Sequence, residues 1–151
     1  ADLGRLLYIY KYGGCYLDMD CLIVDNPFKY TSPKNDRMVL FTEFTVSVDV
    51  LGPRECKNPR NALRVANFAF ATNYKRHPFL ETCIRECMRR LEYIIQLNLE
   101  KWEVTDILWV CGPDVITTMY HAQFEENDSD SSIRLMERGY LRHLGYGSWR
   151  D

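Results

Sequence analysis

The apolar residues of this chain alternate between two spacings, and this alternation limits the folds that the chain can adopt. Apolar residues recur every three or four positions over 3–10, from Pro78 to about residue 95, and again after Pro113, which predicts helices. Short apolar runs predict strands at 15–24, 38–48, 65–71, 106–110 and 133–136. The run 15–24 has apolar residues on both faces, which predicts a strand inside a covered sheet. Strands that alternate with helices predict an α/β fold.

The length and composition are those of one globular domain. The chain has 151 residues, of which 46% are apolar and 13% aromatic, and its net charge is −2. This balanced charge argues against a protein that binds nucleic acid by bulk electrostatics. No apolar run reaches the ~18 residues of a membrane span. Loops are expected at 51–61, 125–132 and 141–151, where glycine, proline and polar residues gather.

Helical spacing begins immediately after Ala1, which is typical of a fragment of a longer protein. We therefore expect residues 1–151 to form a single domain of that protein. A membrane anchor, if the protein has one, is expected outside this segment. The lack of a signal-peptide pattern at the start then says nothing about the compartment.

The cysteines show no metal-binding spacing. They lie at 15, 21, 56, 83, 87 and 111, without a Cys-x-x-Cys pair. Cys83 and Cys87 are four residues apart among apolar neighbours, so we expect buried thiols here and not zinc ligands. An even number of cysteines permits disulfides in a secretory compartment. The glycosylation sequon at 127–129 is compatible with such a compartment.

The run Cys15–Val24 contains the triplet Asp18-Met19-Asp20, the most informative motif in the chain. Residues i and i+2 of a strand point to the same side, so both carboxylates are expected on one face. Two like charges on an otherwise apolar strand repel each other and lose hydration. A divalent cation such as Mg²⁺ or Mn²⁺ would offset both costs. The alternative is a pair of acids at the exposed end of a strand.

Residues before the triplet add to this interpretation. Asp2 and Arg5 share a face of the first expected helix, because they are three positions apart. Gly13-Gly14 forms the turn into the strand, and glycine there lets a ligand approach the backbone. Tyr16 lies two positions before Asp18 and so on the same side. A cation together with Arg5 would favour an anionic ligand such as a diphosphate, whereas the alternative for Arg5 is a surface ion pair with Asp2.

Two segments form a joint pattern, which is Asp2-x-x-Arg5 followed by Tyr12-Gly13-Gly14-Cys15-Tyr16-Leu17-Asp18-Met19-Asp20. This pattern resembles the signature of the DXD-containing sugar transferases, of the family 32 type. That group includes initiating α-1,6-mannosyltransferases, α-1,4-galactosyltransferases, bacterial capsular sugar transferases and the glucosylating domain of clostridial toxins. Weaker similarities follow in the order of the family. They are Asn67–Ala71 with His77-Pro78-Phe79, Cys111–Val115, and His143 with Gly147-Ser148-Trp149.

The resemblance implies a GT-A (Rossmann-like) fold that lacks its N-terminal β-α segment, so that residues 1–151 form a catalytic-domain fragment with the DXD core and the C-terminal part. It implies a metal-dependent hexosyltransferase that uses a UDP- or GDP-linked donor. The acceptor would be a glycan, lipid or protein. The family is associated with retention of anomeric configuration, and no carboxylate here is marked as a covalent nucleophile. Front-face attack is therefore expected, with the leaving phosphate oxygen helping to accept the acceptor's proton.

Matched position by position, the resemblance assigns catalytic and metal-binding roles to the triplet. Asp20 would be a direct ligand of the cation, Mn²⁺ or Mg²⁺. Asp18 would hold the ribose or sugar and approach the metal directly or through water. His143 would be a further metal ligand, and Tyr16 would pack near the nucleoside.

The resemblance also implies a donor site with residues from both ends of the chain. Its expected members are Asp2, Arg5, Gly14, Tyr16, Asn67, Ser148 and Trp149. Asp2 and Arg5 would contact the transferred sugar, and Ser148 and Trp149 would close over the diphosphate. Asn67 and Asp114 are candidates for the sugar and acceptor side.

Plainer interpretations of the later residues stay open. His143 is also compatible with an ordinary surface histidine, Trp149 with an apolar plug under a loop, and Asp114 with a helix cap. For the whole protein, a non-catalytic relic that binds nucleotide sugars or carbohydrate is an alternative. A nucleotidyl- or phosphotransferase ranks last, because the chain lacks a Gly-x4-Gly-Lys-Ser/Thr phosphate loop. The compartment is left open between a Golgi lumen in a eukaryote and the cytoplasm in a bacterium or virus.

Overall fold

The computed structural model describes residues 2–26, 37–45, 63–98, 100–126, 132–137 and 139–144. The elements within these ranges alternate between helices and strands. They are α1 (Asp2–Tyr12), β1 (Gly14–Leu17), β2 (Cys21–Ile23), β3 (Met38–Thr45), β4 (Leu63–Thr72), α2 (Pro78–Gln96), α3 (Val104–Cys111), α4 (Pro113–Glu126), β5 (Ile133–Met136) and β6 (Leu141–His143). The predicted α/β class is confirmed, with a mixed sheet. No helix of the described part is long and apolar enough to cross a membrane.

Four of the strands form one sheet in the order β1-β4-β3-β5. Strand β4 runs antiparallel to both β1 and β3, whereas β3 and β5 are parallel. Strands β1, β3 and β5 therefore have their carboxyl ends at the same edge of the sheet. In open α/β sheets this edge is where ligands bind.

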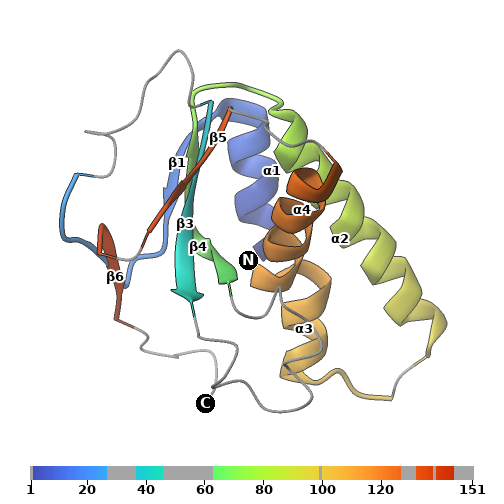
Figure 1. The fold of residues 1–151 in the computed structure, drawn as a ribbon. Helices are drawn as coiled ribbons and strands as arrows, with labels where there is room; N and C mark the ends of the chain where they lie inside the picture. The colour runs from blue at the N-terminus through green and yellow to red at the C-terminus, as the bar shows by residue number, and fades with distance from the viewer. Residues whose placement is uncertain are drawn as a thin grey trace.

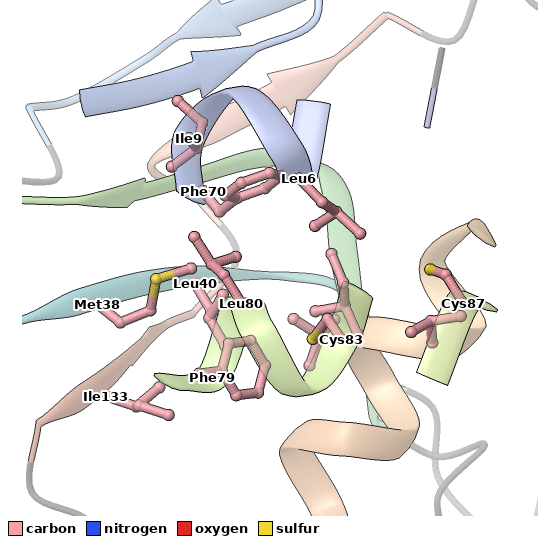
Figure 2. Close-up of a cluster of buried hydrophobic side chains, with 13 residues drawn as sticks. Leu6, Ile9, Met38, Leu40, Phe70, Phe79, Leu80, Cys83, Cys87 and Ile133 are labelled. Atoms are coloured by element: carbon pink, nitrogen blue, oxygen red, sulfur yellow. The ribbon is translucent and has the colours of Figure 1, made fainter. Parts of the chain in front are cut away.

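The helices pack on one face of this sheet, as Figure 1 shows. The core between the two layers contains Leu6 and Ile9 of α1, together with Leu40 and Phe70 from the sheet. Figure 2 shows that Leu80 and Cys83 of α2 point into the same cluster. The other face of the sheet is covered in part by a small sheet of β2 and β6. Residues between β1 and β2 thus connect the two sheets at the carboxyl end of β1.

Helix α2 begins as the sequence predicts and buries a polar residue that the apolar pattern does not show. Pro78 occupies the first turn, and the His77 ring accepts a hydrogen bond from the Phe79 amide. Arg90 is buried, and it donates to the Trp109 carbonyl at 2.7 Å and contacts Glu86 at 2.7 Å. The flanking arginines hold the pKa of Glu86 at about 2. Helix α2 is thereby tied to the last turn of α3.

The prediction of a strand at 106–110 is wrong, because these residues belong to helix α3. Asp106 accepts a hydrogen bond from the Glu103 amide at 2.8 Å, which stabilises the first turn. A five-residue apolar run is compatible with either element, and only contacts with α2 and α4 decide between them. The helix ends at Gly112, where a Cβ atom would lie 2.6 Å from the Leu108 carbonyl oxygen.

Two further expectations differ from the structure. The tail expected to be irregular contains strand β6 at Leu141–His143. Part of the loop expected at 125–132 belongs to α4, which extends to Glu126. The loop at 51–61, the sequon at 127–129 and Cys56 lie outside the described residues. The five described cysteines are free thiols, and Cys83 and Cys87 are buried as expected.

Candidate functional site

A glycine pair connects α1 to β1 and directs the chain toward the acidic triplet. Gly13 has φ +70° and donates to the Ile9 carbonyl at 2.8 Å, which ends the helix in the left-handed geometry that glycine favours. Gly14 has φ +99°, and a Cβ atom there would meet no atom within 4 Å. The backbone at Gly14 is therefore open to an approaching group on the side where a side chain would project.

Arg5 is the centre of the polar contacts at this end of the sheet. Its Nη2 lies 2.7 Å from Asp2 Oδ1, and its Nη1 lies 3.2 Å from Asp18 Oδ1. Nη1 also donates to the Asn67 carbonyl at 2.9 Å, and the guanidinium lies 4.8 Å from the centre of the Tyr16 ring. The Arg5 side chain is only 9% exposed. The expected Asp2–Arg5 pair is thus present, but it belongs to a larger network and not to a surface pair alone.

An irregularity in β4 brings Asn67 to this network. Leu40 pairs with Phe70, whereas Thr42 pairs with Val65, so that residues 66–69 of β4 face the single residue Phe41. In this widened stretch the Asn67 backbone carbonyl accepts a hydrogen bond from Arg5, and the Asn67 side-chain amide donates to Asp2 Oδ1 at 3.4 Å. A register shift of this kind re-aims side chains at the edge of a site. The contact that results joins Arg5 of α1 to Asn67 of β4, 62 positions later in the sequence.

Tyr16 and Asp18 form the second part of the network. The Tyr16 hydroxyl donates to Asp18 Oδ1 at 2.6 Å. The two side chains therefore lie on the same side, as their spacing of two positions predicts. Burial, followed by the hydrogen bond to Asp18, raises the pKa of Tyr16 to about 12. The Tyr16 ring stacks on Phe70, with 5.7 Å between ring centres. Tyr16 is therefore a fixed donor that orients the Asp18 carboxylate.

The prediction of one continuous strand over 15–24 is wrong, because the chain turns at the acidic triplet. The Asp18 amide donates to the Phe68 carbonyl, and the Cys21 amide donates back to the Asp18 carbonyl at 3.0 Å. Met19 is fully exposed at the tip of this turn. In a turn, residues two positions apart do not share a face, so the two carboxylates are not placed side by side as expected for a strand. Instead, Asp18 contacts Arg5 and Tyr16, and Asp20 contacts a residue of β6.

That residue is His143, which the sequence analysis also singles out. Its Nε2 lies 3.2 Å from Asp20 Oδ1, and the Leu144 amide donates to the Asp20 carbonyl at 2.9 Å. The imidazole stacks on Phe68 at 4.3 Å between ring centres, with 8° between the planes. The pairing of β2 with β6 therefore brings the end of the described chain to the acidic turn and fixes the ring.

Three donor atoms of this region are close enough to hold a metal ion. One ligand atom each from Asp20, Cys21 and His143 lies within 4.8 Å of the others. Oxygen, sulfur and nitrogen donors at these distances fit a divalent cation after small side-chain rotations. Burial, then the charges of Asp18 and Asp20, raises the pKa of Cys21 to about 11. Cys21 is not among the residues predicted from the sequence, although its position directly after the triplet is a signal for it.

Asp18 is not a member of this group, and its carboxylate oxygens contact Arg5 and Tyr16 instead. Its approach to the same cation stays a prediction. Near the turn, Asp2, Asp18 and Asp20 carry three negative charges against one positive charge on Arg5. The region is therefore electrostatically suited to a cation.

A second ionic cluster lies at the carboxyl end of β3. Arg64 contacts Glu43 at 3.1 Å and Asp114 at 3.2 Å, so Asp114 is an ion-pair partner as well as a residue of the first turn of α4. Burial raises the pKa of Glu43. Glu43 is not among the residues predicted from the sequence, although an acid inside the apolar run 38–45 is a signal for it. Gly147, Ser148 and Trp149 lie outside the described residues.

These contacts define an α/β domain with an acidic turn at the carboxyl end of an edge strand, held between an arginine network and a histidine. Comparison with protein families agrees with this description. Residues 1–43 match the family described as glycosyltransferase sugar-binding region containing DXD motif. The match confirms the resemblance to DXD-containing sugar transferases over that segment and supports a glycosyltransferase-like function. A search of curated proteins gives no match for the chain.

Proposed function

We propose that this protein is a metal-dependent glycosyltransferase of the GT-A type, which transfers a hexose from a UDP- or GDP-linked donor. The observation that carries the proposal is the turn at Asp18–Asp20, which lies within the matched segment. One acid of the turn is tied to Arg5 and the other to His143. The turn follows the carboxyl end of β1, the edge where α/β proteins bind nucleotides.

The fit between the residues and a divalent cation supports the metal part of the proposal. Asp20 and His143 would hold Mn²⁺ or Mg²⁺, since their donor atoms already lie 3.2 Å apart. When bound, the cation would act as a Lewis acid toward the departing diphosphate. The stack on Phe68 holds the His143 ring, so little side-chain ordering is needed on binding.

The donor-binding part rests on the network around Arg5. Its guanidinium is held by Asp2, Asp18 and the Asn67 carbonyl, yet its buried Nε has no hydrogen-bond partner among the described residues. A buried N–H without an acceptor costs free energy. A hydroxyl of the transferred sugar would supply that acceptor once donor binding shifts the Arg5 side chain and opens its Nε to the site. Asp2 and Asn67 would then orient the sugar, and Asp18 would accept a hydrogen bond from a hydroxyl of the sugar or the ribose.

Further donor contacts come from the other residues of the motif. Gly14 would allow the donor to approach the backbone, and Tyr16 would pack near the nucleoside. Ser148 and Trp149 would close over the diphosphate. A glycan, glycolipid or glycoprotein acceptor would approach on the side of Asp114.

For the stereochemistry we propose retention by front-face attack, in which the leaving phosphate oxygen helps to take the acceptor's proton. A covalent route needs a free carboxylate beside the sugar. Glu43, a half-buried carboxylate of β3, is paired with Arg64, which opposes its use as a nucleophile. A sugar–protein adduct detected by mass spectrometry would contradict front-face attack.

The experiment is a screen of UDP- and GDP-linked hexoses with the intact protein, with and without Mn²⁺, and with release of the nucleoside diphosphate as readout. The proposal predicts slow hydrolysis or transfer for at least one donor, dependent on the cation. Tight donor binding by calorimetry without any turnover would favour the binding-only alternative. Turnover that is unaffected by chelation would contradict the metal dependence.

A further inference from the structure

Cys21 lies directly opposite His143 in the small sheet. The two residues are partners in the antiparallel pairing of β2 with β6. Directly opposed residues project to the same face, with their Cβ atoms about 4.5–5.5 Å apart. The Cys21 thiol and the His143 ring are therefore neighbours because of the backbone pairing and not by chance side-chain rotation.

Asp20 completes a group with three different donor chemistries. The carboxylate, thiol and imidazole ligand atoms lie within 4.8 Å of one another. In a tetrahedral zinc site, ligand atoms are about 3.3–3.8 Å apart, given metal–ligand distances of ~2.0–2.3 Å. The Asp20–His143 distance, 3.2 Å, is within about 0.1 Å of this range, and separations of up to 4.8 Å within the group would have to shorten by about 1 Å at most.

We propose that Cys21 is a third protein ligand of this centre, which makes it an oxygen–nitrogen–sulfur site with a preference for thiophilic borderline cations such as Zn²⁺ and Co²⁺ over Mg²⁺. The location of the centre rests on the proposed function, but the ligand set does not depend on transferase activity. Thiolate ligands select zinc-like ions, whereas all-oxygen sites suit magnesium. The nature of residue 21 thus decides which cations compete for the site.

The binding step is a simple exchange of a proton for a metal ion. The thiol releases its proton to solvent, and the sulfur forms a bond to the cation without any change in oxidation state. Cys21 Sγ gives up its 3.9 Å contact with the Phe68 carbonyl, a weak hydrogen bond at most. The strand pairing of β2 with β6 is unaffected, because its hydrogen bonds are made by the backbone.

The test uses Co²⁺ and the intact protein without a donor. Cobalt bound to a thiolate gives a near-ultraviolet charge-transfer band that oxygen and nitrogen ligands do not give. We expect this band in the wild type and its loss in Cys21→Ser. The Zn²⁺ affinity of Cys21→Ser should fall by at least ~10-fold, the lower bound reported for the loss of residues that support a metal ligand. Cys15→Ser is the matched control, since Cys15 is an exposed cysteine near the same turn, and it should keep the band.

A second measurement needs no substitution and so remains valid if Cys21→Ser folds poorly. Zn²⁺ should protect Cys21 of the wild type from alkylation, mapped by mass spectrometry, while Cys15 reacts at an unchanged rate. A wild type without the cobalt band or a band retained in Cys21→Ser would overturn the proposal. Equal alkylation of Cys21 with and without Zn²⁺, at a pH high enough for the metal-free thiol to react, would overturn it as well. Failure of the proposed function is separate, because it is measured as donor turnover with Mn²⁺.

Discussion

Replacing Asp20 with asparagine is expected to reduce Mn²⁺-dependent turnover of the donor by about 10²–10³-fold, the range found when one group that stabilises developing charge is removed. Asparagine keeps the shape of the side chain but removes the negative charge that faces His143 at 3.2 Å. The cation would then be held more weakly and oriented less well. The rate should be measured at saturating donor over a range of Mn²⁺ concentrations.

Asp25→Asn is the matched control, because Asp25 is an exposed acid just after β2 that contacts the Asn26 amide. This variant loses the same charge five positions away and should keep the wild-type rate within about twofold, as surface changes usually do. Both variants should unfold at nearly the wild-type temperature. Undiminished Mn²⁺-dependent turnover in Asp20→Asn would refute the metal role of Asp20.

Replacing Arg5 with methionine is expected to destabilise the fold by about 3 kcal/mol, the lower end of the range for breaking a buried ion pair. The methionine fills much of the same volume, but it leaves Asp2 and Asp18 without their common partner. Both carboxylates are partly exposed, so solvent compensates for some of the loss. Chemical denaturation should show a lower midpoint with an unchanged slope. Donor binding should be lost together with the sugar contacts.

Arg85→Met separates this effect from the general loss of a helix arginine. Arg85 pairs with Glu81 on the exposed side of α2, and such surface pairs contribute little to stability because solvent screens them. Arg5→Lys is the second comparison, because one ammonium group cannot bridge the same acceptors as a planar guanidinium. If Arg5→Met were as stable as Arg85→Met, the network around Arg5 would not hold the site together.

The sequence predicts the elements whose apolar spacing is long and regular. Helices α1, α2 and α4 and strands β3, β4 and β5 all lie where the pattern places them. In α2 the pattern also predicts buried positions at Met88 and Ile95 that are exposed. Arg90 is buried instead, because its guanidinium contacts Glu86 and donates to the Trp109 carbonyl. The burial of Arg90 depends on this contact with α3, which the apolar pattern of α2 alone does not predict.

The candidate site is predictable where residues are close in the sequence. Asp2 and Arg5 on one helix face, and Tyr16 beside Asp18, follow from spacing alone. The break at the acidic turn does not follow from spacing. It depends on β6, which pairs with β2 from more than a hundred positions away. The contact of Arg5 with Asn67 likewise needs the register shift in β4.

The proposed function depends on a divalent cation that binds at the turn between β1 and β2 together with a nucleotide-sugar donor. Anomalous diffraction from crystals grown with Mn²⁺ and a nucleoside diphosphate would locate this cation. We expect an anomalous peak at roughly 2.0–2.3 Å from an Asp20 oxygen and His143 Nε2, with the diphosphate as a further ligand. A peak at another place, or a bound diphosphate with no ion at Asp20 and His143, would contradict it.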